Sequence, residues 1–169
     1  LVFMSGPDPL TETYDARTDI WAPVATSAEP DRKEGTSVLL PGGDGWRFML
    51  LGGGHDHGDH PDDGTDFEPT ASIETIDLSD ATPTWTEAAP LAFPRMEHNA
   101  VLLPDGAIFV VGGTSDNGED PTPVMIPEMV RAGADSYPQM APLGVPRMYH
   151  STALLLHDGR VAVAGANDM

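Results

Sequence analysis

Residues 95–104 read R-M-E-H-N-A-V-L-L-P, and residues 32–41 match them without a gap as R-K-E-G-T-S-V-L-L-P. A third copy opens as P-R-M-Y-H-S at residues 146–151 and continues through L-L-L at 154–156, with one residue inserted before Asp158-Gly159. After each copy come a turn, an apolar run and glycine, namely Gly53-Gly54, Gly112-Gly113 and then Gly165. A pattern that recurs in register indicates one structural unit repeated along the chain.

Each unit is predicted to contain four short strands. Strand 1 is expected at 99–103 and strand 2 at 107–111, joined by Pro104-Asp105-Gly106, a hairpin turn of the Asp-Gly kind. In the preceding unit, strand 3 is expected at 73–78 and strand 4 around 84–86. The 18 Gly and 17 Pro, placed between short Val- and Leu-rich runs, also indicate many short strands joined by turns.

The repeat length is close to the roughly 50 residues of kelch repeats, whose blades are four-stranded sheets. We therefore predict an all-β fold: a kelch-type β-propeller, with about three four-stranded blades of a larger, seven-bladed ring. The predicted units cover roughly 1–31, 32–94, 95–146 and 147–169, with the first and last incomplete. An all-β sandwich is the alternative, but it does not predict the same ten-residue pattern recurring in register.

The ends of the chain favour a part of a larger protein. The sequence opens within the apolar run Leu1-Val2-Phe3-Met4 and stops just after the apolar run 161–165. A blade has two apolar faces, and propellers close with about four to eight blades, so three cannot form a ring. We expect this stretch by itself to be poorly stable and inactive, and to need the remaining blades of the same chain.

The charge balance disfavours two classes of partner. The chain carries 27 acidic against 8 basic residues, a formal net charge of −19. Such a surface repels nucleic acid and anionic membranes, so neither is an expected partner. The sequence contains no cysteine, which excludes a disulfide within it and fits either redox compartment.

The third copy carries a family resemblance. Residues 146–161 read P-R-M-Y-H-S-T-A-L-L-L-H-D-G-R-V, and this resembles the galactose oxidase/glyoxal oxidase family of copper radical oxidases, which carries R-x-Y-H-S, an apolar run and P-D-G-R-V late in its propeller. The similarity extends over residues 94–167. It implies a secreted enzyme that oxidises a small-molecule or carbohydrate primary alcohol or aldehyde with O₂ and releases H₂O₂.

The resemblance also implies a copper site. Tyr149 would be an axial ligand and the acceptor of the substrate's hydroxyl proton, and His150 an equatorial ligand. The family carries Pro where His157 stands, a variation within the turn. The family's Cys–Tyr radical cofactor and second histidine have no counterpart in this chain, and in the family they come from an early blade and a C-terminal domain.

The site carries a geometric requirement. Adjacent residues of a regular strand point to opposite faces, so Tyr149 and His150 can reach one metal only if the backbone is irregular there. Because strands alternate in direction within a blade, the start of strand 1 should lie at the same end of the propeller as the acidic loop 55–63.

Other readings of these residues stay open. Tyr149 and His150 can serve packing and turn hydrogen bonds, and His98, in the same slot of the previous copy, is expected to be structural. His55, His57 and His60, with Asp56 and Asp59 between them, offer donors for zinc, copper or calcium, or form a solvated loop beside the site.

Arg32, Arg95 and Arg147, each before a first strand, are expected to be structural and to pair with acids or carbonyls of the neighbouring blade. The alternative function for the whole protein is a non-catalytic kelch propeller that binds protein or glycan through its loops.

Overall fold

The computed structural model describes residues 2–42, 46–56, 67–116 and 121–166. In these residues the regular secondary structure consists of strands alone. The strands are β1 (Val2–Met4), β2 (Leu10–Asp15), β3 (Ile20–Thr26), β4 (Thr36–Leu40), β5 (Arg47–Leu51), β6 (Gly54–Asp56), β7 (Phe67–Pro69), β8 (Ile73–Asp77), β9 (Thr86–Ala88), β10 (Asn99–Leu102), β11 (Ile108–Val111), β12 (Glu128–Val130), β13 (Thr152–Leu155) and β14 (Val161–Ala164). The same part of the chain contains no helix long and apolar enough to cross a membrane.

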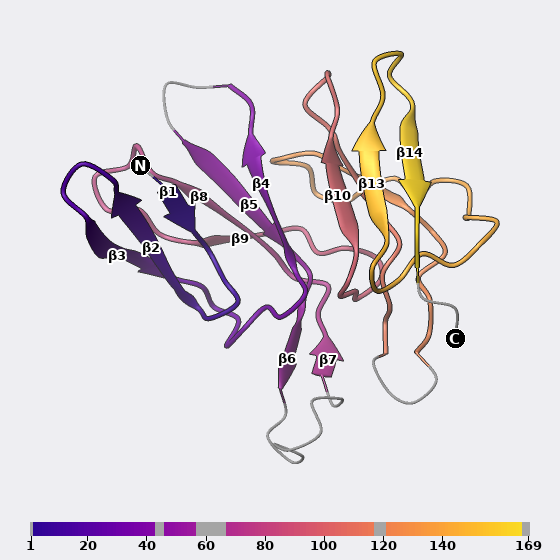
Figure 1. Ribbon diagram of the computed structural model, residues 1–169, viewed down its shortest axis with the longest axis horizontal. Coiled ribbons are helices and arrows are strands. Elements are labelled where there is room, and N and C mark those ends of the chain that lie inside the picture. The colour runs from indigo at the N-terminus through magenta and orange to yellow at the C-terminus, as the bar shows by residue number, and fades with distance from the viewer. Residues whose placement is uncertain (1, 43–45, 57–66, 117–120, 167–169) are drawn as a thin grey trace.

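The strands form separate antiparallel sheets that stand side by side (Figure 1). One has the order β4-β5-β8-β9, and its neighbours have the orders β1-β2-β3, β10-β11-β12 and β13-β14. The first strands of three sheets meet, because β10 contacts both β4 and β13. The all-β fold and the predicted strands 73–78, 99–103 and 107–111 are confirmed to within one residue. The number of blades and the unit boundaries stay predictions.

The core lies between the four-stranded sheet and the sheet that follows it. Met49 of β5 and Ile108 and Val110 of β11 are fully buried, because each of these second strands is covered on both faces. Strands covered on both faces are apolar throughout instead of alternating. Each such side chain contributes about 1.5–3 kcal/mol through burial.

The turn between β13 and β14 corrects the expected place of the inserted residue. Gly159 N–H donates to the Leu156 carbonyl as Gly106 N–H does to that of Leu103, so the copies are already in register before Asp158. At the other end, Gly113 N–H donates to the Arg147 carbonyl as Gly53 N–H does to that of Arg95. The insertion therefore lies between Arg147 and β13.

The burial of two methionines identifies the inserted residue. Met96 and Met148 follow the equivalent arginines and are both buried. In the turns before the first strands, a left-handed backbone occurs at Glu34, Glu97 and His150, with φ of 54°, 60° and 60°. Tyr149 is therefore the additional residue, His150 is equivalent to Glu97, and His98 is equivalent to Ser151. The expectation that His98 and His150 share a slot is wrong.

The arginines before the first strands are structural, but their side chains bind within their own sheet and not to the neighbouring one. Arg95 Nη2 lies 2.6 Å from Glu128 Oε1 on β12, and its Nη1 donates to the Gly112 carbonyl. Arg32 makes the same contacts with Glu74, at 2.7 Å, and with the Gly52 carbonyl.

Each of these carboxylates also holds the segment that enters its sheet. Ala28 N–H donates to Glu74, and Ala92 N–H donates to Glu128. The repeated Arg–Glu pair therefore ties the connection between two sheets to the inside of the second sheet.

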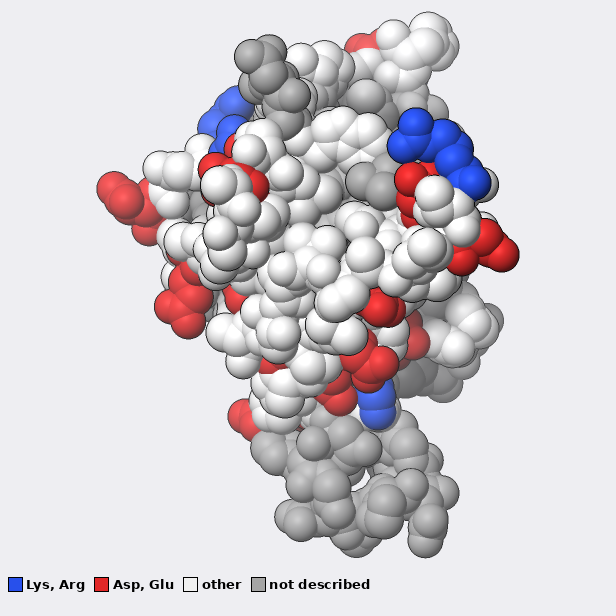
Figure 2. Space-filling model, turned by 90° about the vertical axis from the view of Figure 1, so that its left-hand side faces the viewer, with Lys and Arg blue, Asp and Glu red and all other residues white. Residues whose placement is uncertain are grey.

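The outer face on the side of β1–β3 differs from the rest of the surface. These strands expose Val2, Leu10, Ile20 and Trp21. Figure 2 shows this side of the molecule with acidic side chains mainly around its margin and residues without charge over much of its middle. An apolar face of this kind is what a sheet presents when a further blade packs against it.

Candidate metal centre

Tyr149 and His150 lie in a turn immediately before β13, outside the regular strand. His150 has a φ of 60°, and the Met148 carbonyl accepts a hydrogen bond from Ser151 N–H across the turn. The aromatic rings of Tyr149 and His150 stack with centroids 3.8 Å apart. The irregular backbone that two adjacent ligands require is therefore present, and it keeps both rings together.

The neighbouring strand fixes the start of β13. Asn99 of β10 donates from Nδ2 to Ser151 Oγ at 3.0 Å, and its Oδ1 accepts from Ala153 N–H at 3.2 Å. On the other side of the turn, Arg147 Nη1 donates to the Gly165 carbonyl at 2.6 Å. The turn is thus held at both ends, while Tyr149 itself remains 44% exposed.

A hollow of about 220 Å³ adjoins the two rings. Three consecutive sheets line it, with Glu34, Gly35, Glu97, His98, Asn99, Tyr149, His150 and Ser151. Burial and the nearby Glu34 carboxylate raise the pKa of Glu97, and the Tyr149 N–H and His150 partly oppose that shift. The two glutamates were not predicted as site residues from the sequence. The available signal is that they occupy the same position of successive copies.

His98 lines the same hollow but is 6% exposed. Burial, with a smaller contribution from Arg95, lowers its pKa to about 3, so the imidazole is neutral at ordinary pH. A hydrogen bond with the Arg95 backbone partly opposes that shift. Its ring packs beside Gly52, where any side chain would collide with it.

The histidine-rich loop is described only in part. His55 lies on β6, and its Nε2 is 3.5 Å from Glu68 Oε2 on β7. His57 and His60 lie outside the described residues. Figure 1 shows the β6–β7 hairpin projecting at the end where β4 and β13 begin, as expected from the strand directions.

Over the described ranges, no group of three or more His, Cys, Asp or Glu residues is placed to hold a metal ion. Within those ranges the chain thus offers the Tyr149 and His150 pair to a metal, and the remaining ligands would have to come from other residues of the protein.

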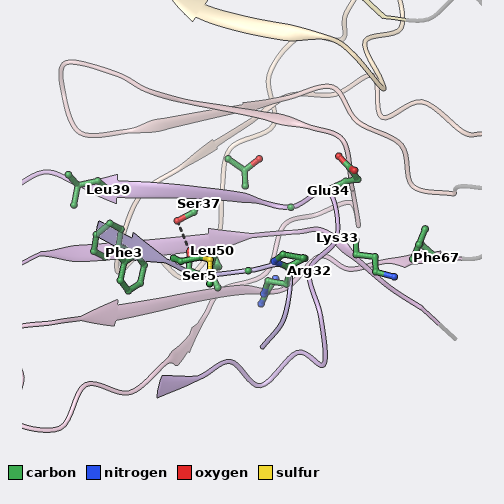
Figure 3. Close-up of a pocket in the computed structure, with 15 residues that line it drawn as sticks. Phe3, Ser5, Arg32, Lys33, Glu34, Ser37, Leu39, Leu50 and Phe67 are labelled. Carbon is green, nitrogen blue, oxygen red and sulfur yellow. Dashed lines mark hydrogen bonds between the residues drawn. The ribbon is translucent and has the colours of Figure 1, made fainter. Parts of the chain in front are cut away.

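A larger groove of about 870 Å³ separates β1 from β4 (Figure 3). Phe3 stacks on Phe48 at 3.9 Å, and a hydrogen bond between Ser5 and Ser37 crosses the groove. At the far end Lys33 extends over the Phe67 ring, 4.4 Å from its centroid. This groove was not predicted from the sequence, because its two walls come from different units.

The chain has relatives among known proteins. Residues 32–169 match the family model described as "Glyoxal oxidase N-terminus". A galactose oxidase of Gibberella zeae is 34% identical over 139 residues, which make up 80% of this chain and 20% of that protein. An aldehyde oxidase, GLOX, of Vitis pseudoreticulata is 31% identical over 142 residues, or 79% of this chain and 27% of that protein. The chain therefore spans about a fifth to a quarter of these relatives.

One solved structure has the same fold over nearly the whole chain. It is described as a novel fungal alcohol oxidase with catalytic diversity among the AA5 family, in complex with copper. The TM-score is 0.82 at 29% sequence identity, and the match covers 94% of this chain and 33% of that one. Because this match covers 94% of the chain, it extends beyond the family-model match into residues 1–31.

Proposed function

Because the chain belongs to the glyoxal oxidase N-terminus family of copper oxidases, we propose that the protein is a copper radical oxidase. It takes a primary alcohol or an aldehyde as its substrate and O₂ as its oxidant. For an alcohol, two electrons and two protons pass from the C–H and O–H groups to O₂, giving an aldehyde and H₂O₂. We further propose that it acts outside the cell, on the strength of the family resemblance alone.

The observation that carries this proposal is the paired Tyr149 and His150 at a left-handed turn. Imidazole is a donor that suits copper, and a phenol can bind a metal as phenolate. The two rings are adjacent, open to solvent and beside a hollow, which fits a metal bound at the surface of a substrate pocket. Bound there, copper would supply the one-electron chemistry that these side chains lack.

The residues of this chain then have separate roles. His150 would hold the metal through its imidazole. Tyr149 would bind through its phenol oxygen and accept the proton of the substrate's hydroxyl group, as a general base within reach of the reacting atom. Asn99 and Arg147 would keep the turn in place from its two ends.

The remaining parts must come from elsewhere in the protein. The chain contains no cysteine, so a Cys–Tyr radical cofactor requires residues beyond these 169. The family resemblance implies that a second histidine ligand would come from a C-terminal domain.

The test is a Tyr149→Phe substitution in the full-length, copper-loaded protein. Phenylalanine keeps the ring that stacks on His150 but removes the oxygen, so peroxide formation should fall by about a hundredfold or more. Tyr14→Phe is the matched control, since that hydroxyl only donates to Asp19 on an exposed turn.

An undiminished rate after Tyr149→Phe would contradict the assigned role. Failure of the full-length protein to bind copper at all would instead favour a non-catalytic propeller that binds protein or glycan.

A further inference from the structure

The sheets β1-β2-β3 and β4-β5-β8-β9 repeat each other, and a turn in each fixes how their residues correspond. Asp15, the last residue of β2, accepts a hydrogen bond from Arg17 N–H. Asp77, the last residue of β8, accepts one from Ser79 N–H in the same way. Asp15 and Asp77 are therefore equivalent, and the two sheets can be compared residue by residue from these turns.

This register places two pairs of residues at equivalent positions. In the first sheet, Val2 of β1 and Trp21 of β3 lie opposite the residue that precedes the turn aspartate. In the second sheet, Phe48 of β5 lies opposite the residue that precedes its turn aspartate, and Trp85, directly before β9, continues the strand to the same level. Val2 and Trp21 therefore correspond to Phe48 and Trp85.

In the second sheet this pair contacts the first sheet. The Phe48 ring stacks on Phe3 of β1 with centroids 3.9 Å apart, and the Trp85 ring lies 6.4 Å from that of Phe3. Trp85 Nε1 also donates to Thr11 Oγ1 on β2 at 2.8 Å, and Thr11 is fully buried. A tryptophan buried between two sheets needs such an acceptor, because an unpaired indole N–H away from water is costly.

The third sheet repeats the arrangement against the second. Glu128 of β12 is the counterpart of Glu74 on β8, since each pairs with the arginine of its own sheet. Counted from Glu128, the equivalent pair is Ile108 and Tyr137. Both belong to one buried cluster with Met49 of β5. In two of the three sheets, this pair of positions is thus covered by the preceding sheet.

In the first sheet the same pair is exposed. Trp21 is 47% exposed, and Val2 is exposed to a similar extent. Leu10 and Ile20 add to the apolar surface around them. Figure 2 shows this side of the molecule with residues without charge over much of its middle. The positions that join the other sheets therefore have no sheet against them within the described part of the chain.

We propose that Val2 and Trp21 dock a further antiparallel sheet of the same protein, and that Trp21 Nε1 donates to a hydroxyl side chain on the third strand of that sheet. The occupant follows from continuity with two contacts already present, in which each sheet meets the one before it through the same pair of positions. The chain spans about a fifth to a quarter of its curated relatives, and the rest of those proteins is long enough to supply such a sheet.

A second copy of this chain fits the surface less well. Two-fold symmetry would place like faces against each other, so Trp21 would meet its own equivalent instead of a third strand.

The residue type of the acceptor follows from the indole. Thr11 accepts from Trp85, whereas Ile73, the equivalent of Thr11, accompanies Tyr137 in the buried cluster. A hydroxyl therefore stands where the facing residue is tryptophan, and Trp21 requires one as well.

Hydroxyl-radical footprinting of the full-length protein tests the docking, because mass spectrometry measures the oxidation rate of each tryptophan separately. Trp21 should be oxidised as slowly as Trp85, and several times more slowly than in the same protein unfolded in urea at equal radical dose. An oxidation rate of Trp21 close to that of the unfolded chain would overturn the proposal. Protection that disappears on dilution would also overturn it, because it would assign the face to a second copy.

Substitution of the equivalent tryptophans tests the hydrogen bond. Trp21→Phe keeps an aromatic ring but removes the N–H donor, as Trp85→Phe does at the contact with Thr11. Both variants should lower the melting temperature of the full-length protein by similar amounts. Trp46→Phe is the matched control, because Trp46 is half-exposed in the turn before β5, and it should leave the melting temperature unchanged. If Trp21→Phe melts no lower than Trp46→Phe, the proposed hydrogen bond is wrong.

Discussion

Arg95 and Glu128 form an ion pair of 2.6 Å in which neither side chain is exposed to solvent. Arg32 and Glu74 repeat the pair in the preceding sheet at 2.7 Å. Removing two charges from water is costly, and each pair offsets that cost with further hydrogen bonds to backbone groups. The repeated pair gives Arg32 and Arg95 the same structural role, while Arg147 in the third copy donates to the Gly165 carbonyl.

Replacing Arg95 with Met should destabilise the full-length protein by about 3–5 kcal/mol, because Glu128 would be left charged and unpaired inside the sheet. Arg131→Met is the control: Arg131 pairs with Asp105 at the surface, where such a bridge is worth about 0–1 kcal/mol. Chemical denaturation measures both. Equal losses in the free energy of unfolding for the two variants would show that the buried ion pair contributes no more than the surface pair.

His98 should make the fold sensitive to acid. Its folded pKa of about 3 lies below the ordinary value, so the unfolded chain binds a proton first as the pH falls. The contribution of neutral His98 to the free energy of unfolding is fully present above about pH 6.5 and is lost as the pH falls from there toward 3. At pH 5 the loss is roughly 2 kcal/mol.

In a His98→Leu variant, the free energy of unfolding should lose the part of its pH dependence that comes from His98. The parts that come from other titrating groups should remain. Thermal melting of the full-length protein between pH 7 and 4 measures it. If the variant and the unmodified protein lose stability in parallel over this range, His98 is not the titrating group.

His150→Gly should separate folding from metal binding. The left-handed backbone at φ 60° costs a residue with a Cβ about 1 kcal/mol that glycine does not incur. The variant should therefore melt no lower than the unmodified protein, and slightly higher, while it binds less copper. Asp19→Gly, at φ 58° in the β2–β3 turn, also loses the hydrogen bond from Tyr14, so it is a control for copper binding alone and should keep the copper. A large loss of stability in His150→Gly would make the residue primarily structural.

Gly112 and Gly133 both have left-handed backbones, at φ 73° and 78°, but differ in surroundings. A Cβ on Gly112 would overlap the Arg147 carbonyl, whereas one on Gly133 would meet nothing within 4 Å. Gly133→Ala should cost about 1 kcal/mol, from the backbone alone. Gly112→Ala should cost several times as much and disturb the turn that carries Tyr149. Equal melting temperatures for the two variants would contradict the close packing at Gly112.

Sequence reasoning succeeded where a pattern is local. The strand 107–111 follows from an apolar run bounded by Gly106 and Gly112, and the repeat supplied the architecture. It failed to place the insertion, because the run Leu154-Leu155-Leu156 matches the previous copy equally well in two registers. The backbone hydrogen bonds of Gly113 and Gly159 place the insertion between Arg147 and β13. The buried Met148 and the left-handed His150 then identify Tyr149 as the additional residue.

Only the arginine of each Arg–Glu pair could be predicted from the sequence. The arginines stand at a fixed place in each copy, but Glu74 and Glu128 follow loops of different length, so their distance along the chain is not constant. The same loops hid the fact that Glu34 and Glu97 share one hollow. Contacts between equivalent positions of successive units become visible only when the units are arranged in space.

The glycine pairs have a consequence for synthesis on the ribosome. Gly53 donates its N–H to the carbonyl of Arg95, and Gly113 to that of Arg147, so each unit is finished by a residue that belongs to the next. During synthesis this hydrogen bond can form only after the following arginine has left the exit tunnel, although the strands of the sheet precede it. A translational pause just before such an arginine would hold the nascent chain with this glycine N–H not yet bound to its carbonyl.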